Sequence, residues 1–213
     1  MDSAAEAAEA ADAVPEERSA RPVRADALRN RARVLEAARR AFAAEGPAVP
    51  LDEIARRAGV GAGTVYRHFP SKEALFEAVV ADRLEQLTEV GRAALAEARS
   101  SADAAGPAFF GFFAAMVADA HEKMDLAEAL SDAGVNLREA TRAAGHNLAQ
   151  VLGALLARAQ AAGAVRGDID LSDLHALTIG AVAAERRQSD TAEAAHRIGH
   201  VTRVICDGLR PAN

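Results

Sequence analysis

Residues 51–75 read LDEIARRAGVGAGTVYRHFPSKEAL, and this stretch decides the fold. Apolar residues at helical spacing give residues 51–58 a single buried face. A glycine-flanked turn at residues 59–61 follows, and Val65 and Phe69 then mark the inward face of a second short helix. Two short helices joined at a tight glycine turn are typical of a helix-turn-helix, whose second helix fits the major groove of DNA. The stretch therefore predicts a DNA-binding protein.

The positive charge of the chain is concentrated around this stretch. The whole sequence carries a net charge of −6, but residues 23–72 hold ten basic and five acidic residues, a net charge of +5. Residues 1–22 and 73–213 carry net charges of −4 and −7. Phosphate binding needs such a local excess of Lys and Arg. An ordinary uneven surface gives the same asymmetry, so the charge supports DNA binding only together with the helix-turn-helix pattern.

The composition favours a helical protein. Half of the 213 residues are hydrophobic, only 4% are aromatic, and Ala dominates the sequence. Ala is the best helix former and a poor strand residue, and the sequence has no alternating strand pattern and no internal repeat. The chain is long enough for one or two domains with a sizeable core. We therefore expect an all-α fold.

The sequence carries no signal for a membrane, a metal or a cofactor. No apolar run approaches the ~18 residues that a membrane span needs, and the N-terminus lacks the hydrophobic centre of a secretion signal. We therefore expect a cytoplasmic location. Cys206 is the only cysteine, which excludes an internal disulfide and a multi-cysteine zinc site. His196 and His200 are four residues apart, but no nearby ligand completes a metal site with them.

The hydrophobic periodicity predicts about nine helices, arranged as a small basic head, residues 23–72, and a larger acidic body, residues 73–213. The first helix is expected to end at Gly46, with Pro47 beyond it. Ser71 is expected to N-cap a long fourth helix. The predicted helices span residues 26–45, 51–58, 62–69, 71–99, 108–124, 126–131, 136–162, 172–187 and 191–209, with loops at 100–107 and 163–170.

Residues 1–22 are predicted to form a disordered tail. They consist mainly of Ala, acidic residues and Pro, and they contain too few large apolar side chains to bury a core. Arg18, Arg21 and Arg24 lie near the junction with the first helix. They leave a second interpretation open, in which a basic arm reaches towards DNA.

The run from residue 34 to residue 75 resembles the N-terminal domain of TetR-family transcriptional regulators. The matching pieces are VLEAARRAF at 34–42, Gly46, LDEIARRAGV at 51–60 and GTVYRHFPSKEAL at 63–75. The segment LLARAQAAGAVRGDIDLSDL at 155–174 is similar to the SbtR-like group of C-terminal domains. The resemblance implies an N-terminal three-helix helix-turn-helix DNA-binding domain, followed by a C-terminal helical domain that binds an effector and dimerises.

The chain departs from the family pattern at the start of the second helix. Many relatives carry a Thr or Ser there, which caps the helix and touches a phosphate. In this chain Val49 and Pro50 precede Leu51. Pro is compatible with the first turn of a helix, but it removes that side-chain contact with phosphate.

The second helix of the pattern is expected to read DNA with few side chains. Its glycine-flanked start leaves the helix tip nearly bare, so that the tip can approach DNA closely. Thr64 and Arg67 can hydrogen-bond to bases, and Arg bound to guanine is the commonest specific contact. By the resemblance, Tyr66, His68 and Lys72 hold phosphates, unless they are simple packing or solvated residues. The predicted DNA-binding residues are Ala62, Gly63, Thr64, Tyr66, Arg67, His68 and Lys72.

The two last helices are the candidates for a homodimer interface. By the resemblance, they form a four-helix bundle with the same helices of a second subunit. The alternative is that their apolar stripes serve only the core of their own subunit. The two stripes consist of Leu174, Leu177, Thr178, Ala181 and Val182, and of Ile198, Val201, Val204, Ile205 and Leu209.

A small-molecule effector is expected to bind among the helices between residues 84 and 182. A mostly apolar cavity with a few polar anchors is the usual form of such a site. Core packing is the alternative role for the phenylalanines of this region. The predicted pocket residues are Phe109, Phe113, Met116, His121, Asn147 and Gln150.

These features favour a ligand-responsive transcriptional regulator. We expect a repressor that binds a palindromic double-stranded DNA operator as a homodimer and is released by a small molecule. A DNA-binding architectural protein without an effector is the first alternative. A helical enzyme is the second, but the sequence has no nucleophile–base signature and no phosphate-binding glycine loop.

Overall fold

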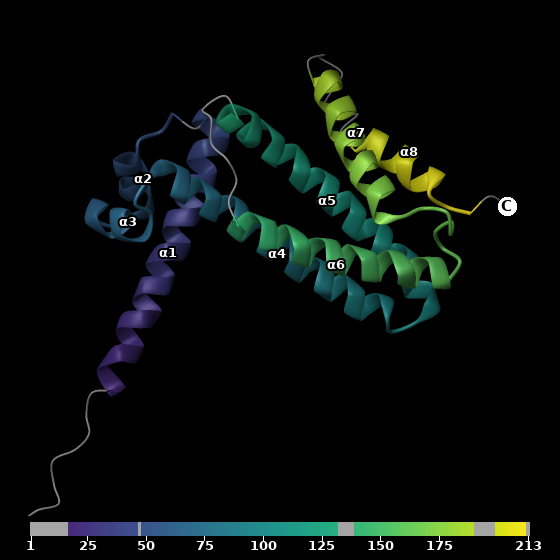
Figure 1. The fold of residues 1–213 in the computed structure, drawn as a ribbon, viewed down its shortest axis with the longest axis horizontal. Helices are drawn as coiled ribbons and strands as arrows, with labels where there is room; N and C mark the ends of the chain where they lie inside the picture. Colours follow the sequence, from purple (N-terminus) through teal and green to yellow (C-terminus); the bar gives the residue numbers. More distant parts are fainter. Residues whose placement is uncertain (1–16, 47, 132–138, 190–198, 212–213) are drawn as a thin grey trace, which may run out of the picture.

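The computed structural model describes residues 17–46, 48–131, 139–189 and 199–211. Every regular element in these ranges is an α-helix, which confirms the predicted all-α class. Figure 1 shows α1, α2, α3 and the beginning of α4 at one end of the molecule, with the remaining helices extending from them. The eight described helices, one fewer than predicted, are α1 (Glu17–Glu45), α2 (Leu51–Ala58), α3 (Ala62–His68), α4 (Lys72–Ala98), α5 (Ala102–Ser131), α6 (Glu139–Ala161), α7 (Leu171–Ser189) and α8 (His200–Gly208).

The difference in number comes from α5, which is one helix of 30 residues. It begins at Ala102, whereas we predicted a loop as far as Pro107. It also continues through residues 126–131, for which we predicted a separate short helix. Both predictions were wrong because they took local breaks in the apolar pattern as helix ends.

The start of α5 is stabilised by a side-chain cap and a close packing contact. The Ser101 hydroxyl accepts a hydrogen bond from the Ala104 amide at 3.1 Å, which satisfies one free N–H of the first turn. A Cβ added to Gly106 would lie 2.9 Å from Cβ of Ala164, so the two backbones approach closely here. Pro107 by itself disfavours a helix at this position. The packing contact between residues far apart in the sequence favours the helix and outweighs this local preference.

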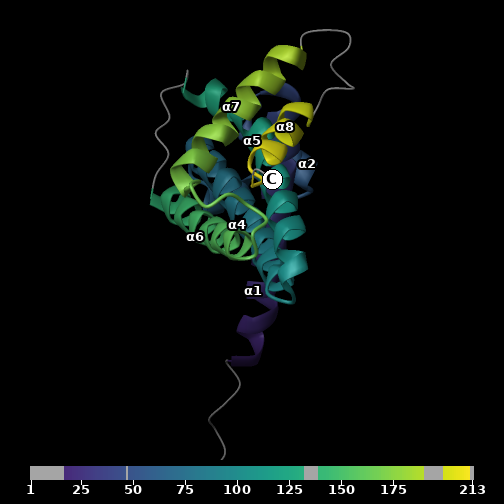
Figure 2. The same ribbon diagram turned by 90° about the vertical axis from the view of Figure 1, so that its right-hand side faces the viewer.

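Helix α1 begins at Glu17, nine residues before the predicted start. Residues 17–22 therefore belong to the helix, whereas residues 1–16 of the predicted tail lie outside the described residues. Ala, Glu and Arg are good helix formers, and extending an existing helix costs far less than starting one. In Figures 1 and 2 the N-terminal half of α1 extends away from the other helices.

The head has its own hydrophobic core, built by α1, α2, α3 and the first turns of α4. Gly46 and Gly59 have φ angles of +74° and +64°, and each ends the helix before it in a left-handed conformation that suits glycine. The rings of Phe42 and Phe76 lie 5.8 Å apart and join α1 to α4. The predicted inward stripe of α1 is confirmed as buried, and it consists of Val34, Leu35, Ala38, Ala41 and Phe42.

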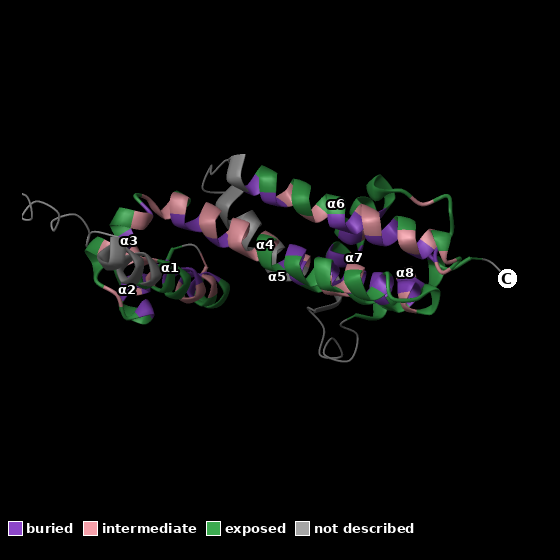
Figure 3. Cartoon of the chain, turned by 90° about the horizontal axis from the view of Figure 1, so that it is seen from below, coloured by how far each residue is buried: buried purple, intermediate pink, exposed green. Residues whose placement is uncertain are grey.

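A second core fills the body between α4, α5, α6, α7 and α8. The stripe of buried residues along these helices is visible in Figure 3. The rings of Phe109 and Phe113 stack at 6.3 Å in the centre of this core. Phe110, which the helical spacing places on another face, is also buried, and the guanidinium of Arg210 lies 4.4 Å from its ring centroid.

The long helix α4 takes part in both cores. Its first turn is capped by Ser71, whose hydroxyl accepts a hydrogen bond from the Ala74 amide at 3.2 Å, as predicted. Phe76 and Val79 then contribute to the head core, and Leu87 contributes to the body core. A single rigid element thus connects the helix-turn-helix to the body.

Candidate nucleic-acid interface

Helices α2 and α3 form a helix-turn-helix with one inward and one outward face. Ile54 and Ala58 of α2 are buried together with Val65 of α3. Phe69, which follows α3, is buried as well, and its backbone N–H donates to the carbonyl of Val65 at 2.8 Å. The predicted inward face of α3 is thereby confirmed, and its other side faces solvent.

The seven predicted DNA-binding residues all lie on α3 or at the first residue of α4. Tyr66 and Arg67 are exposed, and the Tyr66 side chain retains 47% of its accessible surface although it is aromatic. Thr64, His68 and Lys72 are partly exposed. Ala62 and Gly63, at the tip of α3, are exposed to solvent. The seven predicted residues are therefore all accessible to a partner on α3 and the start of α4, and we call this exposed part of the head the α3 face.

The glycines at the tip of α3 are not required by the packing of this chain. A Cβ added to Gly61 or Gly63 would meet no atom within 4 Å. Gly61, the N-cap residue, has φ −68°, which any residue can adopt. Glycine inside a helix costs roughly 0.5–1 kcal/mol relative to Ala. The head therefore loses this stability without a gain in its own packing. Such a loss is expected where another molecule must approach the helix backbone closely.

As the sequence indicated, α2 begins without a Thr or Ser cap. Pro50 occupies the N-cap position with φ −67° and ψ 148°, and no side chain caps the helix. Asp52 and Glu53 lie in the first turn, where negative charge is favourable for the helix dipole. This end of α2 consequently offers no hydroxyl to a phosphate.

Ion pairs within the head engage five of the seven arginines of α1 and α2 whose side chains the structure describes. Glu36 accepts hydrogen bonds from Arg39 and Arg40, of which the shortest is 2.7 Å. Glu53 is paired in the same way with Arg56 and Arg57. The hydrogen bonds from Arg39 and Arg56 are the main causes that lower the pKa of Glu36 and Glu53, each to about 2. These arginines thus contribute little net charge to a partner.

The cations of the α3 face are not neutralised in this way. Among the described residues, no carboxylate forms an ion pair with Arg67 or Lys72. The surface formed by α3 and the start of α4 therefore carries two cations, Arg67 and Lys72, that no described carboxylate neutralises. A phosphate backbone placed against this surface would meet cations that need not leave an internal partner first.

Two arginines of α1 support this surface and were missed in the sequence. Arg33 donates hydrogen bonds from Nε and Nη2 to the carbonyl oxygen of Ala58, at 3.0 and 2.7 Å, and Nη2 also donates to the carbonyl of Gly59. The guanidinium of Arg31 lies 5.7 Å from the centroid of the Phe69 ring. Nothing in the local sequence distinguishes these two from the other arginines of α1, because their partners lie 25 or more residues further along the chain.

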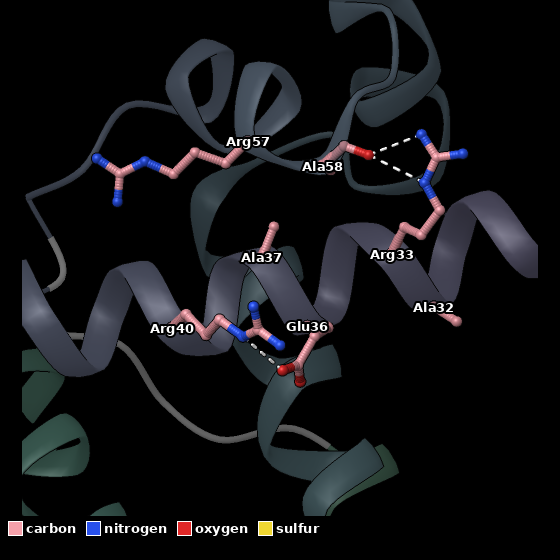
Figure 4. Close-up of a pocket in the computed structure, with 7 residues that line it drawn as sticks. All are labelled: Ala32, Arg33, Glu36, Ala37, Arg40, Arg57 and Ala58. Carbon is pink, nitrogen blue, oxygen red and sulfur yellow. Dashed lines mark hydrogen bonds and ion pairs between the residues drawn. The ribbon is translucent and has the colours of Figure 1, made fainter.

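A hollow of about 550 Å³ lies between α1 and α2, next to the hydrogen bonds that join Arg33 to Ala58. Figure 4 shows Arg33 directed at the Ala58 carbonyl and Arg40 directed at Glu36, while Arg57 points away from both. Arg57 is itself bound to Glu45 and Glu53. Each charged side chain here is therefore engaged within the protein, and the hollow belongs to the packing of the head. It is lined by Ala32, Arg33, Glu36, Ala37, Arg40, Arg57 and Ala58.

A cavity of about 400 Å³ lies in the body, between α4, α5, α6 and α7. Of the predicted pocket residues, only Met116 is among its described lining residues. Phe109 and Phe113 are fully buried in the core, and Asn147 and Gln150 lie at the surface side of α6, away from this cavity. The side chain of His121 lies outside the described residues. The prediction selected aromatic residues, which lie in the core. The cavity is lined mainly by aliphatic residues.

Several lining residues were missed in the sequence. Asp119 is a single acidic residue in the apolar run of α5, three positions after Met116, and this spacing was a signal that its side chain shares a face with Met116. His175 and Thr178 also line the cavity, and they come from α7. Thr178 had been placed in a dimer stripe instead.

The stripe of α7 that we considered for dimerisation faces the core of its own subunit. Its residues Leu174, Thr178, Ala181 and Val182 are buried in the single chain. These four residues therefore serve the core of their own subunit, which was the alternative to a dimer interface. Ala176, Gly180 and Ala183 of α7 are exposed, whereas Ile179 is 49% exposed and lines the body cavity. On α8, Thr202 and Cys206 are buried, whereas Val204 is 57% exposed and Val201 and Ile205 are partly exposed. Residue 198 lies outside the described residues.

Within the described ranges, no three His, Cys, Asp or Glu side chains gather where they could hold a metal ion. His196 lies outside those ranges, and the ring of His200 interacts with Arg203 at 3.1 Å. Burial raises the pKa of the Cys206 thiol, which suits a packing residue. None of the described helices combines the length and the apolar character needed to cross a membrane.

Comparisons with known proteins place this geometry in a family. Residues 34–79 match the description "bacterial regulatory proteins, TetR family", and residues 104–211 match "transcriptional regulator SbtR-like, C-terminal domain". Among curated proteins, the regulators TtgW and SrpR of Pseudomonas putida are 45% and 44% identical over 69 residues. These segments cover 32% of this chain, and 52% of TtgW and 32% of SrpR, so the chain is matched to only a fraction of either relative.

Solved structures match over most of the chain. A TetR transcription regulatory protein from Mycobacterium vanbaalenii is 46% identical, covers 89% of this chain and 100% of its own, and superposes with a TM-score of 0.69. A TetR transcriptional regulator from Streptomyces coelicolor is 31% identical, covers 86% of this chain and 99% of its own, and also has a TM-score of 0.69. The family consists of non-enzymatic regulators. The chain belongs to the TetR family of transcriptional regulators.

Proposed function

We propose that this protein is a ligand-responsive repressor that binds a palindromic operator as a homodimer and leaves it when a small molecule occupies the body. The observation that carries the DNA-binding role is the charge of the α3 face. Arg67 and Lys72 are not held by carboxylates of the described chain, whereas each arginine of α1 and α2 whose side chain is described has a partner within the head. The head thus presents two cations without a described carboxylate partner, one on the helix that fits a major groove and one at the start of α4 beside it.

Within this proposal the residues of the α3 face divide into two roles. Arg67 lies at the exposed side of α3 and can form a bidentate contact with guanine, while Thr64 bonds to a neighbouring base edge. Tyr66, His68 and Lys72 bind phosphates and fix the position of α3 in the groove. The bare tip at Gly63 lets the helix enter deeply enough for these short-range contacts.

The dimer uses the outward sides of α7 and α8. Val204 of α8 is a large apolar residue that is 57% exposed in the single chain. The small residues Ala176, Gly180 and Ala183 of α7 are exposed at helical spacing and allow close approach of a second helix. Two heads held in this way read two half-sites about one helical turn of DNA apart, ~34–36 Å, or a multiple of that distance.

The ligand acts on the heads through α4. This helix lines the body cavity with Leu84 and Leu87, and its first turns belong to the head core through Leu75 and Phe76. A molecule that changes how α4 packs against α5 and α6 therefore changes the orientation of α3. Such coupling between two sites is typically worth about 1–3 kcal/mol.

Selection of bound DNA from a random pool, with the full chain, tests the proposal. We expect enrichment of one palindromic sequence, a footprint confined to it, and a dimer in analytical ultracentrifugation at micromolar concentration. Uniform coverage of long DNA would instead indicate an architectural protein. A small molecule that binds the body and leaves operator affinity unchanged would not be the effector.

A further inference from the structure

We propose that the body cavity takes an apolar organic molecule with a cationic end, and that this end binds against Asp119. The inference rests on the proposed ligand response and specifies its chemistry. The cavity has a volume of about 400 Å³, equivalent to roughly 13 water-sized units at ~30 Å³ each. That volume suits an organic molecule of moderate size.

The walls of the cavity are mainly aliphatic. Each of the four surrounding helices contributes apolar side chains, and α6 adds the small residues Gly145 and Ala149. Burial of apolar ligand surface on such walls contributes about 25 cal/mol per Å² before the costs of binding. Leu171 and Ile179 of α7 line the cavity at exposed positions. The buried or partly buried large apolar lining residues are Leu84, Leu87, Met116, Leu148, Leu152 and Val182.

The charged groups at the cavity determine which polar end is favourable. Asp119 lines it with a side chain that is only 6% exposed. Among the described residues, neither Lys nor Arg lines the cavity. The hydroxyl of Thr178 already donates to the carbonyl of Leu174 at 2.8 Å, and His175 lies at an exposed position of α7. The deepest polar group of the wall is therefore a carboxylate.

This arrangement discriminates between ligands by charge. A ligand carboxylate would lose its hydration in an apolar site and would face Asp119 without a wall cation to compensate. A neutral hydroxyl could donate one hydrogen bond to the Asp119 carboxylate. A cation gains a charge-charge attraction to Asp119 that the low dielectric of the site strengthens.

Asp119 also connects the cavity to the helix that leads to the head. Its carboxylate forms an ion pair with Nε of Arg83 on α4, and Arg83 is not among the lining residues. A cationic ligand in the cavity thus competes with Arg83 for Asp119. The carboxylate that recognises the ligand is the same one that holds α4 against α5.

A series of ten-carbon ligands tests the charge preference. Binding of decyltrimethylammonium, 1-decanol and decanoate to the full chain is measured by calorimetry, well below micelle-forming concentrations. We expect the cation to bind at least tenfold more tightly than decanoate, with the alcohol between them. Equal or tighter binding of decanoate would overturn the inference.

Substitutions assign the preference to Asp119. In Asp119→Asn the ratio between the cation and decanoate should fall below about twofold, whereas the matched control Asp103→Asn, at an exposed position of the same helix, should keep the wild-type ratio. An unchanged ratio in Asp119→Asn would overturn the proposal. If Asp119→Asn does not fold, Arg83→Gln decides, because removal of the competing cation should tighten decyltrimethylammonium binding at least threefold; unchanged or weaker binding would overturn it.

Release of DNA is measured separately, by anisotropy of the selected operator with and without the cation. A charge preference without release would leave the cavity chemistry standing and count against the proposed ligand response. Release by decanoate, together with tighter binding of decanoate, would support the ligand response and overturn only the cationic assignment.

Discussion

Arg33 of α1 binds the carbonyl oxygen of Ala58 with two hydrogen bonds, of 3.0 and 2.7 Å, at the point where α2 ends. The last carbonyls of a helix have no partner within the helix. Here a side chain from 25 residues earlier supplies one, and it holds the turn from which α3 starts. The angle at which α3 leaves the head therefore depends on a residue that lies outside the helix-turn-helix.

Arg33→Ala should weaken both folding and DNA binding. Loss of these charge-assisted hydrogen bonds at a partly buried site should lower the free energy of unfolding by about 1–2 kcal/mol. DNA affinity should fall as well, because the turn no longer fixes α3. Urea denaturation and anisotropy with the selected operator measure the two effects. Arg40→Ala, which removes an exposed and ion-paired arginine of the same helix, should change neither by more than about 0.5 kcal/mol.

Gly63→Ala should separate stability from DNA binding. The new methyl group meets no atom of the protein within 4 Å, so helix propensity alone should raise the free energy of unfolding by about 0.5–1 kcal/mol. The same methyl group should weaken operator binding, because it occupies the tip that approaches DNA. Gly111→Ala, at an open and exposed position of α5, is the matched control and should stabilise the protein without a change in DNA affinity. Undiminished operator affinity in Gly63→Ala would show that the tip does not approach DNA closely.

Arg67 and Lys72 should give different kinds of defect. Arg67→Ala should cost about 1–3 kcal/mol on the selected operator and should relax the base preference at one position of each half-site. Lys72→Ala should weaken all sequences alike and reduce the slope of log affinity against log salt by about 1. Anisotropy on the operator, on single-base variants and on unrelated DNA distinguishes the two. An Arg67→Ala protein with the original sequence preference would contradict the base-reading role.

Local sequence was sufficient to predict most of the head. The inward residues of α1 and α3, the stop at Gly46 and the cap at Ser71 all depend on neighbours within one or two turns of helix, and each prediction was confirmed. Periodicity and capping report such short-range relations directly. The exposed or partly exposed positions of the seven DNA-binding candidates followed from the same spacing.

Features that depend on distant parts of the chain could not be predicted in this way. The start of α5 rests on the approach of Gly106 to Ala164, and the helix-turn-helix rests on Arg33 at Ala58. The cavity next to Asp119 is formed by four helices, and its shape exists only after they pack. The concentration of Phe in α5 indicated a hydrophobic site, but the rings fill the core and leave no space there for a ligand.

Gly91→Ala should destabilise the body. A Cβ on Gly91 would lie 2.7 Å from Cγ1 of Val151 and 2.8 and 2.9 Å from two ring atoms of Phe112, so both neighbours must move. Overpacking of this kind costs about 1–3 kcal/mol, which exceeds the gain in helix propensity. The melting temperature should therefore fall in Gly91→Ala and rise slightly in Gly111→Ala. A stabilised Gly91→Ala protein would show that α4 and α6 can separate without cost.

The contribution of Glu36 to stability should disappear in acid. The hydrogen bonds from Arg39 first, and from Arg40, hold its pKa at about 2 in the folded protein, below the usual 4.5. A lowered pKa means that the unfolded chain takes up the proton first as the pH falls. The stabilisation is therefore complete above about pH 4.5 and is lost as the pH approaches 2. Because the pair is partly exposed, this stabilisation should amount to about 1 kcal/mol or less.

Thermal melts should show that Glu36→Gln is less stable than the wild type at pH 6 and nearly equal to it at pH 2. Glu97→Gln, which replaces an exposed glutamate of α4, should show no such dependence. A difference between Glu36→Gln and the wild type that is as large at pH 2 as at pH 6 would mean that Glu36 stabilises the head by packing, without a contribution from its charge.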